Sequence, residues 1–184
     1  SDIVTATWAS VVVEAPGGGI AVDHLVTGPT GRAMGPCSSS VAPTWYLPVG
    51  TTSLGVQNRL AVFNPFAADA VVDITFETET DRRTPPEYEG LVIPAGHVRV
   101  LSIDEVVTVR EQVATQVVAR TGLVVAEQLE MVGDESDEPT ATTILLGAPA
   151  TAHTWHLPAG RPVGEDVGGR IVVFNPGERD AEVD

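Results

Sequence analysis

Residues 44–50 read TWYLPVG, and residues 154–160 read TWHLPAG. The similarity continues into the next apolar segment, where residues 59–65 (RLAVFNP) are matched by residues 170–176 (RIVVFNP). The copies are 110 residues apart at the Trp and 111 afterwards. A period of this length indicates tandem domains, because the repeats of solenoid proteins run about 20 to 50 residues.

The repeat also suggests where the domains divide. A weaker similarity relates residues 20–25 (IAVDHL) to residues 124–129 (VVAEQL), at an offset of 104. Since 184 residues accommodate two domains of about 100 residues each, we predict a first β-sandwich repeat over 1–112. The second repeat, 113–184, is incomplete, because Asp184 aligns with Asp73 and the counterpart of residues 74–111 is missing.

The repeat also permits an alternative division of the chain. In this alternative, residues 41–131 form a complete central sandwich, and residues 1–26 combine with residues 151–184 to form the other. An incomplete sandwich leaves an open strand edge that invites pairing with another chain. A strand-exchanged dimer is therefore expected.

The local sequence pattern predicts an all-β fold. Apolar and polar residues alternate in segments bounded by Gly, Pro, Asn and Asp, as in strands joined by tight turns. Seven strands within about ninety residues suggest immunoglobulin-like sandwiches; they are expected at 41–47, 58–64, 69–79, 89–93, 97–103, 113–120 and 122–131. Turn residues predict two hairpins, one around Pro94 to His97 and one around Thr121 and Gly122. A capping-box spacing at Ser102 and Glu105 predicts one short helical turn.

Charge and composition narrow the classes of partner. The net charge is -15, and all ten basic residues are arginines. An acidic chain without a basic stripe is a poor candidate for binding nucleic acid or an anionic membrane. No apolar run reaches the roughly 18 residues of a transmembrane helix. Cys37 is the only cysteine, which argues against a disulfide framework, and we expect an unreactive thiol.

Three aromatic residues are candidates for ligand contact. Trp45, Trp155 and Tyr88 would have to lie in an open groove to stack on a sugar ring. The repeated setting of the two Trp residues favours the opposite interpretation, a large core residue of a sandwich. Phe63 and Phe174 are expected to pack, whereas Asn64 and Asn175 are expected to end strands by hydrogen bonding to nearby backbone.

No motif predicts catalysis, a cofactor or a metal. His153 and His156 are three apart in an expected strand and point to opposite faces. The acidic loop 134–138 offers oxygen ligands for calcium but departs from the EF-hand spacing, and a solvated loop is the preferred interpretation. The sequence contains no nucleophile elbow and no phosphate-binding loop. The chain is therefore predicted not to be an enzyme.

The Trp-x-Leu-Pro segments, the Val-Phe-Asn-Pro segments, residues 70–74 and residues 119–127 resemble an uncharacterised actinobacterial family of secreted or membrane-anchored envelope proteins. The resemblance implies a sandwich fold and an extracytoplasmic location, and it carries over no catalytic residues. The predicted function is a structural, scaffolding or adhesive role at a bacterial cell envelope, with an unknown protein or glycan as partner. The alternative is a carbohydrate-recognition module or an accessory domain of a cell-wall-acting protein.

Overall fold

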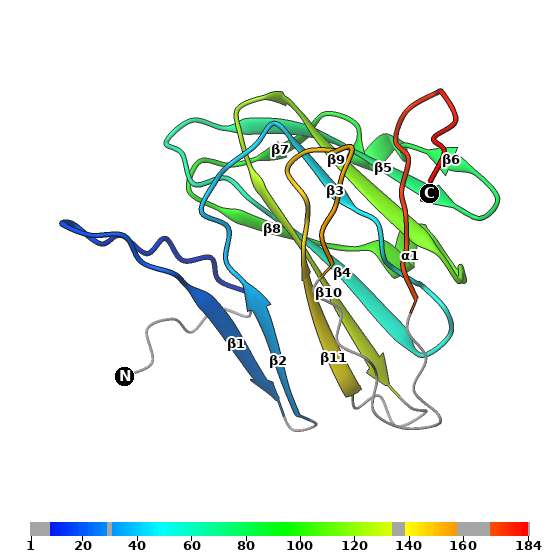
Figure 1. Cartoon of the computed structure of the whole chain (residues 1–184), viewed down its shortest axis with the longest axis horizontal. Helices are drawn as coiled ribbons and strands as arrows, with labels where there is room; N and C mark the ends of the chain where they lie inside the picture. The colour runs from blue at the N-terminus through cyan, green and yellow to red at the C-terminus, as the bar shows by residue number, and fades with distance from the viewer. Residues whose placement is uncertain (1–7, 29–30, 134–138, 158–169, 184) are drawn as a thin grey trace.

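The computed structural model describes residues 8–28, 31–133, 139–157 and 170–183 (Figure 1). Nearly all of the regular structure in these residues is antiparallel strand, which confirms the all-β fold class. The strands are β1 (Asp23–Gly28), β2 (Gly31–Pro36), β3 (Thr44–Leu47), β4 (Val56–Phe63), β5 (Ala70–Thr78), β6 (Arg82–Arg83), β7 (Leu91–Ile93), β8 (Val98–Ser102), β9 (Val113–Thr121), β10 (Val125–Gly133) and β11 (Pro139–Leu146). A 3-10 helix (Pro86–Tyr88) and the α-helix α1 (Ile103–Val106) interrupt them.

Two sheets enclose one hydrophobic core. The first has the strand order β11-β10-β4-β8, and the second has the order β3-β9-β5-β6, with β7 also paired to β5. Alternate residues of the central strands point inward, because successive side chains of a strand lie on opposite faces. In β5 the buried residues are Ala70, Val72, Ile74 and Phe76, and in β4 they include Leu60 and Val62. The result is a β-sandwich.

Both predicted hairpins are wrong. β9 pairs with β3 and β5, whereas β10 pairs with β4 and β11 in the opposite sheet. In the same way β7 pairs with β5, and β8 pairs with β4. The turns do lie where Gly96 and Gly122 predict them, and both glycines have positive φ. A turn motif fixes a change of chain direction, and the pairing is then decided by the core that each strand covers.

The strand pairing corrects the division of the chain at residues 112 and 113. β9 and β10 follow that boundary, yet they pair with β5 and β4, which precede it. A boundary there would cut both sheets. The alternative central sandwich at residues 41–131 contains most of the observed strands, but β11 extends it to Leu146. Among the described residues of 151–184 no strand is formed.

A separate hairpin covers one side of the sandwich. β1 and β2 form a two-stranded sheet, and β2 lies against β11 (Figure 1). Ala33 and Gly35 of β2 are buried, and a Cβ added at Gly35 would stand 2.8 Å from Ile144 Cγ2. On the same face of the hairpin, His24 Nε2 lies 3.5 Å from Glu127 Oε1 of β10. The hairpin is thus placed by close backbone approach and one polar contact.

The predicted helical turn forms as α1, but without the expected capping box. Ser102 occupies the N-cap position and makes no side-chain cap hydrogen bond. Asp104 instead reaches across to β4, where its carboxylate accepts a hydrogen bond from Asn58 N at 3.0 Å and pairs with Arg59. The turn is therefore held by strand β4.

Candidate functional site

Trp45 lies in the core. Its exposed fraction is 0 %, and its indole Nε1 donates a hydrogen bond to Val124 O at 2.7 Å. Burial removes both ring faces from solvent, so Trp45 cannot stack on a ligand. This placement agrees with the core interpretation and corrects its inclusion among the ligand-contact candidates.

Tyr88 is also buried. Its exposed fraction is 7 %, and its ring meets Phe76 edge to face at a centroid distance of 5.7 Å. The hydroxyl donates to Ser102 O at 3.4 Å, and burial raises the pKa of this hydroxyl. Tyr88 therefore closes the core beside the 3-10 helix and is also corrected as a candidate for ligand contact.

Trp155 is the one candidate ligand residue of the three that is exposed. Its exposed fraction is 60 %, against 0 % for its counterpart Trp45. The same contrast runs through the second copy, which exposes side chains whose equivalents are buried: Leu157 for Leu47, Ile171 for Leu60, and Val173 for Val62. We call residues 151–157 and 170–183 the second-copy segment. It presents core-type side chains to solvent.

The turn after the Phe-Asn-Pro motif has the same hydrogen bonds in both copies. Asn64 Nδ2 donates to Ala68 O at 2.8 Å, and Phe66 N donates to Asn64 Oδ1 at 3.0 Å. At the repeated position, Asn175 Nδ2 donates to Arg179 O at 2.7 Å, and Gly177 N donates to Asn175 Oδ1 at 3.1 Å. Both Asn residues use the same backbone positions, four and two residues later, as the motif predicts.

Part of the second-copy segment rests on the outer side of the β3 sheet. The Phe174 ring meets the Tyr46 ring edge to face at 6.3 Å, and Arg82 Nη1 donates to Pro176 O at 3.1 Å. Figure 1 shows this segment near β6. These contacts leave Trp155, Ile171 and Val173 exposed.

A second exposed apolar stretch precedes β1. Residues 8–22, which we call the N-terminal arm, contain no strand, and their large apolar side chains are exposed: Trp8, Val11, Val12, Val13 and Ile20. The alternative division of the chain placed residues 1–26 in the second sandwich, whereas residues 8–22 form no strand in the structure. Large contiguous apolar exposure marks a surface that another protein segment covers.

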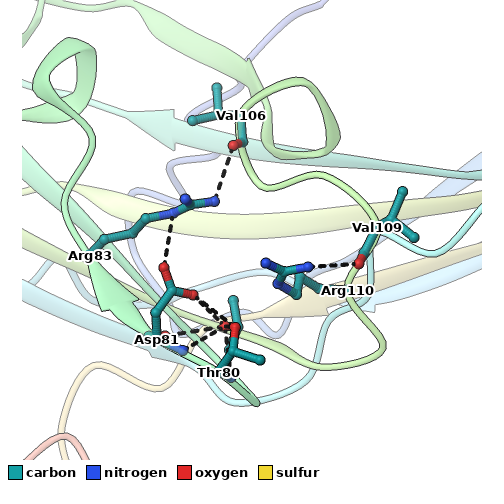
Figure 2. Close-up of polar contacts among 7 residues, drawn as sticks. Thr80, Asp81, Arg83, Val106, Val109 and Arg110 are labelled. Atoms are coloured by element: carbon teal, nitrogen blue, oxygen red, sulfur yellow. Dashed lines mark hydrogen bonds and ion pairs between the residues drawn. The ribbon is translucent and has the colours of Figure 1, made fainter.

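A polar cluster joins the β5–β6 turn to the loop after α1. Figure 2 shows Asp81 facing Arg83, with an Nε–Oδ2 distance of 3.6 Å, while Arg83 Nη2 donates to Val106 O at 3.3 Å. The Thr78 hydroxyl donates to Asp81 Oδ1, and this bond is the main cause of the lowered pKa of Asp81. Both arginines in the figure contact backbone carbonyls, since Arg110 Nη1 donates to Val109 O at 3.1 Å. The bond from Arg83 to Val106 fastens β6 to the end of α1.

The same loop contains a strained residue. Val109 has φ of 50°, which is costly for a β-branched side chain, by about 1–3 kcal/mol. Its neighbour Arg110 is fixed on both backbone groups, because Arg110 O accepts from Thr52 N at 2.9 Å and Arg110 N donates to Thr52 Oγ1 at 3.1 Å. These bonds hold the strained conformation in place.

Carboxyl groups with opposite pKa shifts predict a stability maximum at weakly acidic pH. Burial raises the pKa of Glu130, so the folded state takes up its proton first and gains stability as pH falls from neutral. The hydrogen bond from the Arg120 guanidinium lowers the pKa of Asp73. The ionised Asp73 therefore stabilises the folded state above the ordinary Asp pKa of about 3.9, and this stabilisation is lost as the pH falls through the lowered pKa. Urea midpoints measured from pH 8 to pH 3 should rise and then fall. Glu130→Gln should reduce the rise of the urea midpoint between neutral and weakly acidic pH. Arg120→Gln should reduce the fall of the midpoint at lower pH. Midpoints of the native chain that fall steadily from pH 8 would contradict this prediction.

The sequence also led to predictions about metal binding, the Cys37 thiol and membrane-spanning helices. No group of three or more His, Cys, Asp or Glu residues within the described ranges is placed to hold a metal ion. The acidic loop 134–138 lies outside the described residues. Cys37 is exposed as a residue. The pKa of its thiol is nevertheless raised, first by partial desolvation of the sulfur and then by the negative charge of Glu127. A raised pKa lowers the fraction of reactive thiolate. Among the helices that the structure describes, none is long and apolar enough to span a membrane.

Comparison with known proteins adds a fold and a family. A solved structure described as "Crystal Structure of Thermotoga maritima 1070" is similar at a TM-score of 0.51 and 16 % identity, over 58 % of this chain and 93 % of that one. At this identity the likeness shows the fold alone. No curated protein matches the chain. A family model described as a family of unknown function matches residues 9–184, and the chain therefore belongs to the DUF5719 family.

Proposed function

We propose that the chain is a non-enzymatic structural module built from tandem immunoglobulin-like sandwich repeats, with a scaffolding or adhesive role outside the cytoplasm at a bacterial cell envelope. One observation carries the proposal: the second-copy segment exposes Trp155, Ile171 and Val173, whose counterparts form the core of the first copy. Large exposed apolar surfaces mark interaction sites, and side chains that are core residues in the first copy suit contact with another protein segment.

The extracytoplasmic location rests on the resemblance of the Trp-x-Leu-Pro and Val-Phe-Asn-Pro segments to envelope proteins. It is tested in the source cells by adding a protease to intact cells and probing with an antibody against the chain. Loss of the antibody signal while a cytoplasmic marker survives supports the location. Survival of the signal until the cells are lysed would overturn it.

The alternative function is carbohydrate recognition, and the exposure of Trp155 is the observation that favours it. An exposed indole can stack on the apolar face of a sugar ring, which is a contact that Trp45 and Tyr88 cannot make from inside the core. The structural proposal also requires an exposed Trp155, so a binding experiment has to separate the two functions.

Fluorescence separates them. In a Trp8→Phe variant the remaining tryptophans are the buried Trp45 and the exposed Trp155, so a change in the exposed emission reports on Trp155. We expect no saturable spectral shift on titration with soluble peptidoglycan fragments or neutral polysaccharides at low protein concentration. A saturable shift, together with glycan binding by isothermal titration calorimetry that Trp155→Ala abolishes, would establish the glycan function and displace the structural one.

A further inference from the structure

The β1–β2 hairpin repeats the β10–β11 hairpin in the same register. In β1 and β2, Asp23 is paired with Pro36. Glu127 lies 104 residues after Asp23, Leu146 lies 110 residues after Pro36, and these two residues are paired in β10 and β11. The agreement continues along both hairpins, with His24 and Gly35 matching Gln128 and Leu145, and Leu25 and Met34 matching Leu129 and Ile144. The hairpin therefore corresponds in register to the last two strands of the sandwich.

The N-terminal arm, although it forms no strand, corresponds in position to β9. At the same offset of 104, residues 9–17 correspond to β9, and Gly18 corresponds to Gly122 in the crossing turn. The inward residues of β9 are Val113, Thr115 and Val117. Their counterparts are Ala9, Val11 and Val13, of which the two valines are strongly exposed. Residues 9–36 thus correspond to β9, β10 and β11 together.

The second-copy segment needs the strands that the N-terminal region carries. In the observed sandwich β3 pairs with β9, and β4 pairs with β10. The second copy repeats the β3 and β4 motifs and exposes their apolar side chains. We propose that residues 9–28 and 31–36 of one copy of the chain pair with residues 154–157 and 170–183 of a second copy and cover their apolar side chains, as β9, β10 and β11 cover β3 and β4. This deepens the proposed structural function, since it names the partner.

The partner is a second copy because the two segments occupy different sides of one molecule. The β1–β2 hairpin lies beside β11, whereas Phe174 lies on Tyr46 and Pro176 accepts a hydrogen bond from Arg82 (Figure 1). The hairpin face that carries His24 covers β11 in the described structure. In the proposed assembly, the chain that supplies its N-terminal residues is the donor, and the chain whose second-copy segment they cover is the acceptor. The same hairpin face then covers the apolar side chains of the acceptor, so His24 cannot contact Glu127 of its own chain at the same time.

The observed sandwich fixes the register of the assembly. Because Trp45 is opposite Val117, Trp155 should be opposite Val13 of the donor chain. Because Leu60 is opposite Gln128, Ile171 should be opposite His24.

Charge agrees with the proposed register. Glu127 and Arg59 are diagonal neighbours across β10 and β4. The corresponding residues of the assembly are Asp23 of the donor and Arg170 of the acceptor, which are again opposite charges. Opposite charges on neighbouring strands favour the pairing.

Sedimentation of the full chain and two complementary variants tests the proposal. Val13→Asp blocks the donor and Val173→Asp blocks the acceptor, while Leu54→Asp, at an exposed position outside both segments, is the matched control. The native chain and the control should gain mass with concentration, and each blocked variant should remain monomeric. An equimolar mixture of the two blocked variants should recover a dimer, because it still contains one intact donor and one intact acceptor.

Two outcomes would overturn the proposal. One is a native chain that stays monomeric up to millimolar concentration. The other is association of Val13→Asp or Val173→Asp as strong as that of the native chain, which would place the contact elsewhere. Far-UV circular dichroism of each variant shows whether the sandwich remains folded. Neither outcome decides the cellular location or glycan binding, which the protease and fluorescence experiments address separately.

Directed cross-linking tests the register independently. Ala119 N donates to Pro43 O, so the alternation of an antiparallel ladder makes Thr44 and Val118 a pair without mutual hydrogen bonds, with Cα atoms about 4.5 Å apart. The equivalent pair is Thr154 and Glu14. In a Cys37→Ser background, mixing Glu14→Cys with Thr154→Cys chains under mild oxidation should yield a disulfide-linked dimer. Glu14→Cys mixed with Val183→Cys should yield much less, and equal yields would contradict the register.

Discussion

Replacement of Trp45 by alanine is expected to lower the free energy of unfolding by about 3–5 kcal/mol, the usual cost of removing a fully buried large aromatic side chain. The indole is completely buried, and its Nε1 is bonded to Val124 O. Its loss leaves a cavity between the two sheets and removes one of the two hydrogen bonds that Val124 O accepts, the other being from Ala42 N. Since domains have a total stability of about 5–15 kcal/mol, this single change should remove a large share of it. Urea denaturation followed by far-UV circular dichroism measures the effect.

Trp155→Ala is the matched control for this prediction. The two tryptophans stand in the same motif, but Trp155 is 60 % exposed. At concentrations where the chain is monomeric, Trp155→Ala should change the free energy of unfolding by less than about 0.5 kcal/mol, as surface substitutions usually do. Equal losses at the two positions would show that the second-copy segment is buried in the monomer. Trp45→Phe separates the two contributions, because it keeps much of the burial and removes the hydrogen bond.

The sequence predicted the strands well because each has a clear alternation of its own. Val72, Ile74 and Phe76 were expected on one face of a strand at 69–79, and all three are buried in β5. The seven expected strands did not include β1 and β2, nor β6, which has only two residues, nor β11, which begins at a proline. β2 contains two glycines and β6 is too short, so neither has a periodic pattern that stands out.

The choice of sheet could not be predicted in the same way. Gly122 correctly marked a turn, yet β9 and β10 on its two sides enter opposite sheets. A tight turn between alternating segments is compatible both with a hairpin and with a crossing between layers. The core decides between them, since Val117 and Ala126 both have to be buried, and burial depends on strands far away in the sequence.

The candidate site shows the same limit. Sequence alone placed Trp45 and Trp155 in equivalent motifs, and it could not tell that one is buried and the other exposed. The difference arises because the strands that cover Trp45 include β9, which is present beside the first copy, while the second copy has no strand paired with it in the described residues. Exposure is a property of the neighbours, and the motif does not contain them.

Asn64→Ala is expected to cost about 2–3 kcal/mol, because unsatisfied buried polar groups are expensive at about 1–3 kcal/mol each. Asn64 is 1 % exposed, and its Nδ2 donates to Ala68 O at 2.8 Å and to Ile93 O at 3.1 Å. It ties the end of β4 to the end of β7 in the opposite sheet. Alanine would leave these carbonyls and Phe66 N without their partner.

The repeat again supplies the control, and here it tests the local motif against its burial. Asn175 makes the equivalent bonds to Arg179 O and Gly177 N, but it is exposed, so water can replace them. Asn175→Ala should therefore cost less than about 1 kcal/mol in the monomer. Asn64→Asp keeps the acceptor for Phe66 N while placing a carboxylate against two carbonyl oxygens, so its loss should be large at neutral pH and smaller once acid restores a donor. If Asn64→Ala and Asn175→Ala had the same small effect in urea denaturation, the turn itself, and not its burial between the sheets, would carry the stability.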